Sequence, residues 1–234
     1  MNNLGILAWI LGFIPGIAWM VYVYRKDIHE PEPLGWVVVL FILGALVVFP
    51  VALIESWMTS RMGISEPQTV TDAARVSWFV AGFVEELAKM AVVLAVVAYR
   101  KTFDEPMDGI VYASAVALGF ASAENVLYIG RFGNAVILFR APLATLGHLL
   151  FSSIWGYAIG NARFDHDHRL SLLGKGFLLS AFFHGLYNFL IFTQVFAAFA
   201  VYLVIMTLRK MLVRMVDSAQ ERSPFKPELE DTNL

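Results

Sequence analysis

The 234-residue sequence contains no cysteine and little charge, and each shortage excludes a class of protein. Without cysteine there can be no disulfide, no thiolate metal site, no iron–sulfur cluster and no cysteine nucleophile. Charged residues make up 15% of the chain and hydrophobic residues 59%. An ordinary soluble domain has about 25% charged and about 45–50% apolar residues, so this class is excluded. The net charge of −2 provides no basic surface field, so we expect no nucleic-acid partner.

The sequence contains several long apolar segments. A membrane-spanning helix needs about 20 mostly apolar residues, and seven segments have about this length. The sequence therefore predicts an all-α fold, a polytopic membrane helix bundle of about seven transmembrane helices in a lipid bilayer. The predicted spans are 4–24, 34–57, 76–99, 109–130, 141–160, 172–192 and 195–212.

The distribution of Lys and Arg predicts the direction in which these spans cross. With the N-terminus outside, the cytoplasmic segments hold twelve cations and the outer segments hold four. Because cytoplasmic loops carry the excess of positive charge, we expect an N-out, C-in topology. Residues 1–215 are predicted to form one transmembrane domain, and the polar residues 216–234 a disordered cytoplasmic tail.

Ionisable residues inside the predicted spans are the strongest functional signal. An ionised side chain at the bilayer centre costs about 2.5–3.5 kcal/mol or more, so such residues must pair, bind a ligand or line water. They occur in the segments FVEELAKM, GFASAENVLY, ATLGHLLFSS and FFHGLYNF. The polar residues of these four segments that we consider candidates for a site are Glu85, Glu86, Glu124, His148, His184 and Asn188. Lys89 is expected to be a structural partner of the two glutamates.

The predicted depths of three of these residues agree. At about 1.5 Å per residue, Glu85 lies roughly 14 Å below the outer start of its span. His184 and Glu124 lie roughly 18 and 22 Å above the inner starts of theirs. In a hydrocarbon layer about 30 Å thick, all three lie at or above the midplane, so one polar cavity can hold them. His184 and Asn188 are four residues apart and share a helix face.

These residue types suit hydrolysis by an activated water molecule. A carboxylate or an imidazole can act as a general base. Two histidines with one or two glutamates can instead hold zinc with an open coordination position. An amide such as that of Asn188 can stabilise a developing oxyanion. The residues alone leave both the zinc and the metal-free mechanism open.

Taken together, the four segments resemble the PrsW family of intramembrane proteases, within the clan of the CAAX prenyl endopeptidases and bacteriocin-processing membrane proteases. The resemblance extends to PGIAWMVYVYRKDIHEPEP and FDEPMDGIVY and covers residues 10–195. It implies a multi-pass protease of the bacterial plasma membrane. It also implies a substrate, a single-span anti-sigma factor whose site-1 cleavage starts the release of a stress sigma factor.

The resemblance also implies roles for individual residues. Glu85 and Glu86 match the double glutamate of the family, and we expect one of them to be the general base. Asn188, in the fourth motif, is expected to stabilise the oxyanion. Those expected to bind zinc or position the water are Glu124, His148 and His184.

Three further sequence interpretations lie outside these motifs. Glu105 and Asp108 match an acidic stretch usual in the family and are predicted to be structural or regulatory. A proton-coupled transporter with a Glu/Lys/His relay is one alternative function, although the sequence shows no pseudo-symmetric halves with paired broken helices. A non-catalytic membrane scaffold is the other, and the energetic cost of the buried charges argues against it.

Overall fold

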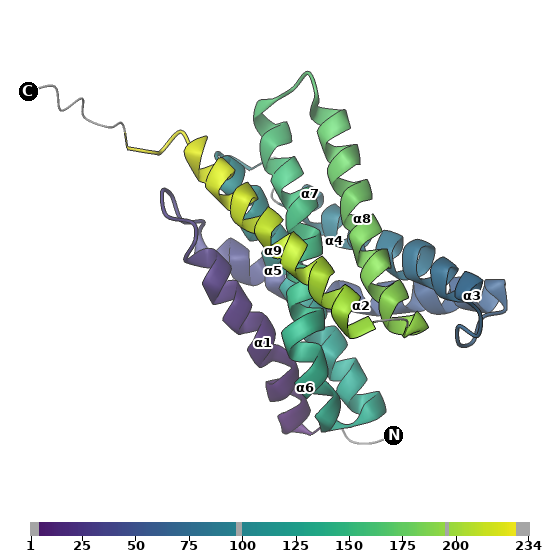
Figure 1. The fold of residues 1–234 in the computed structure, drawn as a ribbon. Helices are drawn as coiled ribbons and strands as arrows, with labels where there is room; N and C mark the ends of the chain where they lie inside the picture. The colour runs from purple at the N-terminus through teal and green to yellow at the C-terminus, as the bar shows by residue number, and fades with distance from the viewer. Residues whose placement is uncertain (1–4, 97–99, 195–196, 228–234) are drawn as a thin grey trace, which may run out of the picture.

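The computed structural model describes residues 5–96, 100–194 and 197–227, and its regular elements are helices (Figure 1). Five stretches are long and apolar enough to cross a membrane. The predicted all-α class is therefore confirmed, and the protein is a multi-pass membrane protein. The five are α1 (Ile6–Tyr24), α2 (Leu34–Met62), α5 (Pro106–Phe132), Leu143–Phe164, which contains α7 (Leu146–Phe164), and α8 (Arg169–Thr193).

The two other predicted spans are helical but are not among these five. The span 76–99 consists of a π-helical segment, η1 (Val76–Gly82), followed by α4 (Phe83–Val96), and residues 97–99 lie outside the described part. The span 195–212 begins with residues 195–196, also outside that part, and continues as α9 (Ala197–Glu221). Charged residues lower the hydropathy of both. The remaining elements are α3 (Val70–Arg75), η2 (Asn134–Val136), α6 (Ile137–Arg140) and η3 (Ala141–Thr145).

The last long helix, α9, differs from the expectation of a disordered tail starting at residue 216. It continues to Glu221 because its apolar stripe continues, with buried residues three or four positions apart as in an amphipathic helix. Residues 228–234 of the expected tail lie outside the described part. The buried residues of the stripe are Val201, Ile205, Leu208, Leu212, Met215, Val216 and Ala219.

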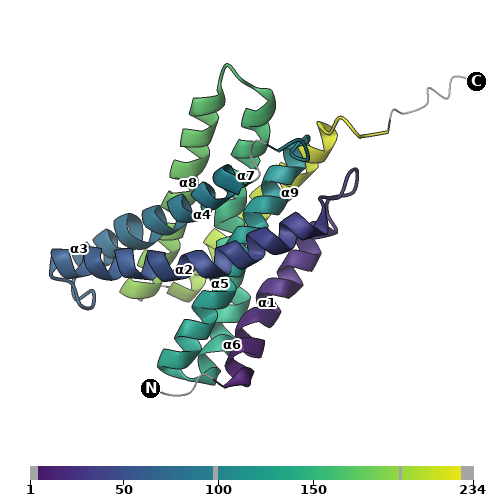
Figure 2. The ribbon, with the colours of Figure 1, turned by 180° about the vertical axis from the view of Figure 1, so that it is seen from behind.

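Helix α5 is the centre of the bundle, with α1, α2 and α7 packed around it (Figures 1 and 2). Small residues allow this packing: a Cβ atom at Gly109 would collide with backbone atoms of Gly156 and Gly160 on α7. Such close contacts between small residues are typical of helix association in membranes. The α5–α7 pair is therefore a fixed frame, and it carries Glu124 and His148.

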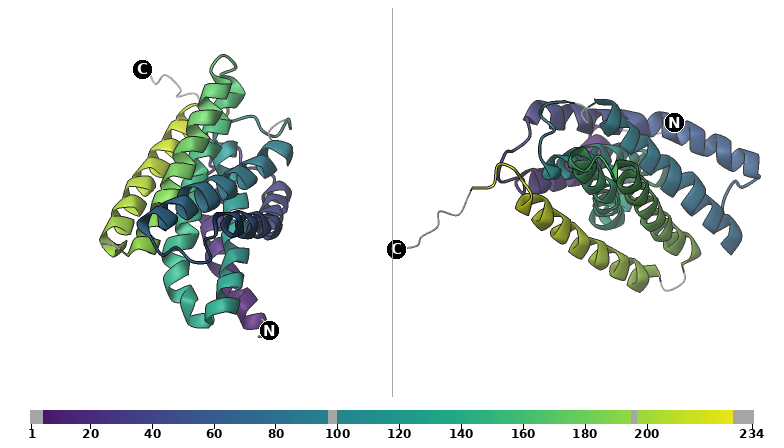
Figure 3. Two further views of the ribbon diagram at one scale, coloured as in Figure 1. Left: turned by 90° about the vertical axis from the view of Figure 1, so that its right-hand side faces the viewer. Right: turned by 90° about the horizontal axis from the view of Figure 1, so that it is seen from above.

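The segments predicted to be cytoplasmic meet at one end of the bundle. The Gln220 side chain donates a hydrogen bond to the Lys26 carbonyl, which joins the end of α9 to the α1–α2 turn. Arg163 Nε, near the end of α7, donates to the Phe103 carbonyl at 3.2 Å. The start of α1 lies at the opposite end, as the left view of Figure 3 shows.

Candidate active site

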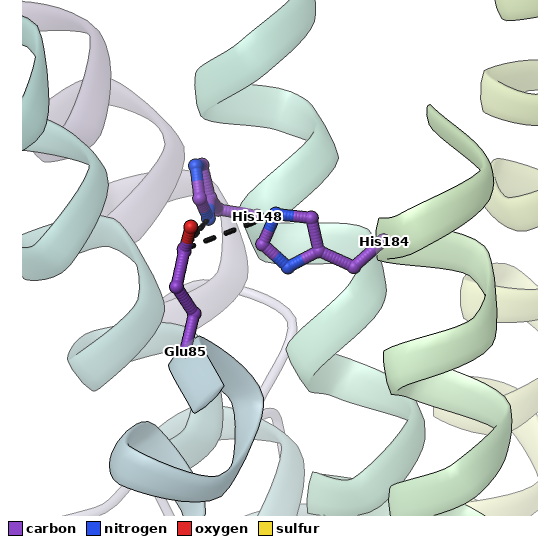
Figure 4. Close-up of side chains that lie close together, drawn as sticks. All are labelled: Glu85, His148 and His184. Carbon is purple, nitrogen blue, oxygen red and sulfur yellow. Dashed lines mark ion pairs between the residues drawn. The ribbon is translucent and has the colours of Figure 1, made fainter. Parts of the chain in front are cut away.

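Glu85 on α4, His148 on α7 and His184 on α8 converge in the interior (Figure 4). Glu85 Oε2 lies 3.8 Å from His148 Nδ1 and 3.8 Å from His184 Nε2. The two imidazole rings are nearly perpendicular, with centroids 5.0 Å apart. All three residues are buried, with Glu85 5% exposed. The structure therefore brings together Glu85, His148 and His184, whereas the sequence grouped the two histidines with Glu124 as the possible zinc ligands.

A π-helical segment precedes two of these three residues. Segment η1 ends at Gly82, three residues before Glu85, and η3 ends at Thr145, three residues before His148. The π-helical hydrogen-bond pattern widens the helix and is often found at functional sites. It changes the direction in which the following side chains point, so a regular helical wheel drawn across either boundary misplaces them.

The far side of His148 is held by Glu124. Glu124 Oε2 lies 2.9 Å from His148 Nε2 and 2.9 Å from Arg140 Nη2. An ionised carboxylate can only accept hydrogen bonds, so His148 Nε2 carries the proton and Nδ1 presents its lone pair to the centre. Glu124 thus lies behind His148, not among the three converging atoms.

His184 is held in the same way by Glu86. Glu86 Oε1 lies 2.8 Å from His184 Nδ1, so this nitrogen donates and Nε2 presents its lone pair towards Glu85. A carboxylate on the far nitrogen of a histidine is the usual support of a metal-binding imidazole. Each histidine of the cluster therefore has its own supporting glutamate.

Glu86 has no oxygen left for a substrate. It is fully buried, and Oε1 also accepts from Lys89 Nζ at 2.8 Å. Its other oxygen accepts hydrogen bonds from Ser152 at 2.7 Å, Trp155 at 2.8 Å and Ser180 at 3.2 Å. Of the two adjacent glutamates, Glu85 is the one that faces the open centre.

Lys89 supplies the positive charge of the cluster. Its Nζ, fully buried, donates to Glu85 Oε2 at 3.2 Å and to Glu86 Oε1 at 2.8 Å, and lies 3.0 Å from His148 Nδ1. The ammonium group therefore touches two of the three atoms that face the centre. One cation here partly compensates two carboxylates that would otherwise be buried without a counter-charge.

A cavity of about 690 Å³ opens from this cluster. Glu85, His148 and His184 form part of its wall, and so does Asn188, as expected from its position one helical turn after His184. Several other cavity-lining or supporting residues were not expected to be part of the site. Among these, the spacing of four residues from a site histidine could have revealed two, Ser152 and Ser180, whereas no sequence signal indicated Glu55, Arg140, Trp155 or Tyr187.

The converging side chains suit a catalytic metal ion. Catalytic zinc is held by three protein ligands, two histidines and a glutamate being one known set, with a fourth position open. Ligands at about 2.0–2.2 Å from such an ion are about 3.3–3.6 Å apart, close to the separations of 3.8 Å seen here. The lone pairs of both imidazoles point the right way, and Lys89 would have to release Glu85 and His148.

The fold and this site define a class: a membrane-embedded hydrolase of the metal-dependent type, with its centre inside a helix bundle. A comparison with known families agrees. The family described as PrsW family intramembrane metalloprotease matches residues 32–213, so the chain belongs to the PrsW family. The protein is therefore an intramembrane protease, as the sequence motifs predicted.

Curated relatives agree with this assignment. The chain is 38% identical to Protease PrsW of Geobacillus kaustophilus over 183 residues, 78% of this chain and 79% of the relative. It is 34% identical to Protease PrsW of Oceanobacillus iheyensis over 206 residues, 86% of this chain and 92% of the relative. Identity to Protease PrsW of Bacillus subtilis is 36% over 182 residues, 77% and 80% of the two chains. No solved structure matches the chain.

Proposed function

We propose that the protein is a zinc-dependent site-1 protease that cleaves a single-span anti-sigma factor in the bacterial plasma membrane. The observation that supports this most directly is the convergence of Glu85 Oε2 with His148 Nδ1 and His184 Nε2 beside the cavity. The cavity lies among the helices of a membrane protein, and this is where a protease must bind a substrate that is itself a membrane helix. The names of the relatives support a protease.

In this proposal His148 Nδ1, His184 Nε2 and one oxygen of Glu85 would hold a zinc ion. Zinc in such a set acidifies a bound water and polarises a carbonyl. Glu124 then acts as a positioning residue for His148, in place of the ligand role expected from the sequence, because its oxygen is on the far nitrogen. Glu86 positions His184 in the same way.

The remaining steps belong to the side chains of the cavity. The second oxygen of Glu85 accepts the proton of the attacking water and returns it to the leaving amine. The Asn188 amide lines the same cavity and stabilises the oxyanion that forms on the scissile carbonyl. Arg140, also in the wall, holds Glu124 ionised by its contact of 2.9 Å.

We propose that the chain crosses the membrane seven times, N-out and C-in, as one transmembrane domain with a cytoplasmic tail. Two contacts support this: the end of α9 meets the α1–α2 turn, and the end of α7 meets Phe103 in the segment before α5. These segments carry the excess of Lys and Arg. The chain has no cysteine, so single cysteines at the exposed positions 134 and 166 can be tested with an impermeant thiol reagent on intact cells. Labelling of position 134 alone is expected.

The substrate is tested by co-expression. The protein is expressed with each tagged single-span anti-sigma factor of its own genome, and blots are inspected for a shortened product. Wild type is compared with Glu85→Gln and with Glu66→Gln, a matched change at an exposed position. We expect the shortened product with wild type and with Glu66→Gln, but not with Glu85→Gln. A product in all three, or in none for every candidate, contradicts the proposal.

Glu124→Gln is expected to weaken zinc binding and cleavage by about 10–100-fold, the usual effect of losing the supporting partner of a metal-binding histidine. The amide keeps the size of the side chain but loses the charge that holds His148 and Arg140. Zinc affinity by competition with a chromogenic chelator checks this, with Glu66→Gln as the control. Unchanged affinity would argue against the supporting role.

Lys89→Met is expected to lower the free energy of unfolding by about 3–5 kcal/mol, because two buried glutamates lose their counter-charge. Zinc would then replace the missing charge, so zinc should raise the melting temperature of this variant more than that of wild type. Melting curves with and without zinc check both effects. Leu87→Met, at an exposed position of the same helix, is the control.

A further inference from the structure

A second group of buried acids lies away from the active site, where the α1–α2 turn meets the start of α5. Asp27 and Glu32 belong to the turn, Glu105 directly precedes α5, and Asp108 lies in its first turn. None of the four is more than 3% exposed. Single oxygens of Asp27, Glu105 and Asp108 all lie within 4.8 Å of one another.

No protein cation compensates these acids within the described residues. Ion pairs in that part of the chain do not involve any of the four. Two cations of neighbouring segments make other contacts. Lys26 lies over the Tyr22 ring at 5.7 Å, and Arg163 donates to the Phe103 carbonyl. Four carboxylates without a counter-charge are unfavourable in a buried position.

Two of these carboxylates each keep one oxygen without a partner. Asp27 Oδ2 accepts the Glu32 N–H at 3.2 Å, and Glu32 Oε2 accepts the Tyr112 hydroxyl. Asp27 Oδ1 and Glu32 Oε1 are buried and receive no hydrogen bond from an N–H or hydroxyl group of the described residues; the other side chains these two acids meet are carboxyl groups, Glu105 for Asp27 and Asp108 for Glu32. A buried polar atom without a partner is unfavourable and calls for an explanation, an unplaced ion being one.

The other two carboxylates are fixed in place. Asp108 Oδ2 accepts the N–H groups of Asp104 at 2.7 Å and Glu105 at 2.9 Å. Glu105 Oε2 accepts the hydroxyl of Ser223 from the end of α9. Burial and the Glu105 carboxylate together raise the pKa of Asp27 to about 8, and burial raises that of Glu32 to about 8. Burial, which disfavours the charged form, is the larger cause of both pKa shifts, and the neighbouring carboxylates add to it.

We propose that Asp27, Glu105 and Asp108, with Glu32 beside them, bind a divalent cation of the Ca²⁺ or Mg²⁺ type. The available donors are oxygens, which these hard cations prefer and which distinguish this site from the imidazole-containing active site. Oxygens up to 4.8 Å apart fit around one Ca²⁺ ion, whose ligands lie at about 2.3–2.6 Å. The proposal does not depend on the protease function.

Such an ion would join three parts of the chain. It would link the α1–α2 turn to the start of α5 and, through Ser223 and Glu105, to the end of α9. Glu124 lies on the same helix as Asp108, sixteen residues further, or about 24 Å along α5. The cation would therefore hold one end of α5, and Glu124, which supports His148, lies towards the other end of the same helix.

The test uses the full-length protein in detergent, carrying Glu85→Gln so that the active site lacks one ligand. After removal of metals by a chelator, binding of ⁴⁵Ca²⁺ is measured by equilibrium dialysis, and melting curves are recorded with Ca²⁺ or with Mg²⁺. We expect one ion per chain and a melting temperature that rises with the logarithm of cation concentration. The cation that saturates at the lower concentration identifies the ligand.

Three further variants locate the ion. Asp27→Asn and Asp108→Asn should each raise the dissociation constant by about tenfold or more, because each removes one charged ligand. Glu66→Gln, an exposed acid between α2 and α3, should leave it unchanged. The proposal is overturned if neither cation binds the Glu85→Gln protein, or if Asp27→Asn binds it equally well. Asp108→Asn can disturb the start of α5, but the Glu85→Gln protein and the Asp27→Asn variant decide the outcome without it.

Discussion

Replacing Glu85 by glutamine is expected to reduce the rate of substrate cleavage by about 10²–10⁴-fold, the usual contribution of a general base. Glutamine has nearly the same shape but cannot accept a proton from water. It also removes the charge that faces His148 Nδ1 and His184 Nε2. The turnover of a purified anti-sigma substrate in proteoliposomes measures the effect.

A comparison with Glu86→Gln makes this experiment sharper. Glu86 accepts hydrogen bonds on both oxygens and is fully buried, so its replacement should lower both activity and melting temperature. Glu85→Gln should lower activity with little change in melting temperature. Glu66→Gln, exposed between α2 and α3, should change neither. Full activity of Glu85→Gln would refute the assignment of the base.

His184→Ala is expected to abolish both zinc binding and cleavage, a larger effect than the 10–100-fold of a lost supporting partner. The variant removes one of the nitrogens that face the centre and leaves Glu86 Oε1 with Lys89 as its remaining partner. Zinc content measured by mass spectrometry after dialysis, together with the cleavage assay, checks both results.

His166→Ala serves as the matched control for this experiment, because His166 is exposed in the turn between α7 and α8. Its zinc content and activity should equal those of wild type. If His184→Ala binds a full equivalent of zinc, the ion is held elsewhere. If it is active without zinc, the metal-dependent mechanism itself is wrong, and water activation by Glu85 alone becomes the better explanation.

Much of the site could be predicted because the membrane makes buried charge expensive. Glu85, Glu124 and His184 were recognisable from their depth in apolar segments, and His148 from being an ionisable residue in such a segment. The separate roles of Glu85 and Glu86 were not, because neighbours on a helix point about 100° apart and packing decides which one faces the cavity. The π-helical segments before Glu85 and His148 also change the direction of the side chains, and no sequence rule places them.

Contacts between segments far apart along the chain also could not be predicted from the sequence. Arg140 was counted among the outer cations, yet it pairs with Glu124 behind His148. Asp27 was part of an acidic turn with no expected partner, and it meets Glu105 only after α1 and α5 have packed. In both cases tertiary packing joins residues whose separation along the chain gives no periodic signal.

The position of Lys89 has a consequence for biogenesis. Glu85, Glu86 and the lysine that compensates them belong to the same helix, α4, with the lysine four and three residues after the two glutamates. The segment can therefore enter the bilayer carrying part of its own counter-charge, and its insertion need not wait for α7 and α8. The histidines, which can enter as neutral rings, then complete the polar centre when the later helices dock.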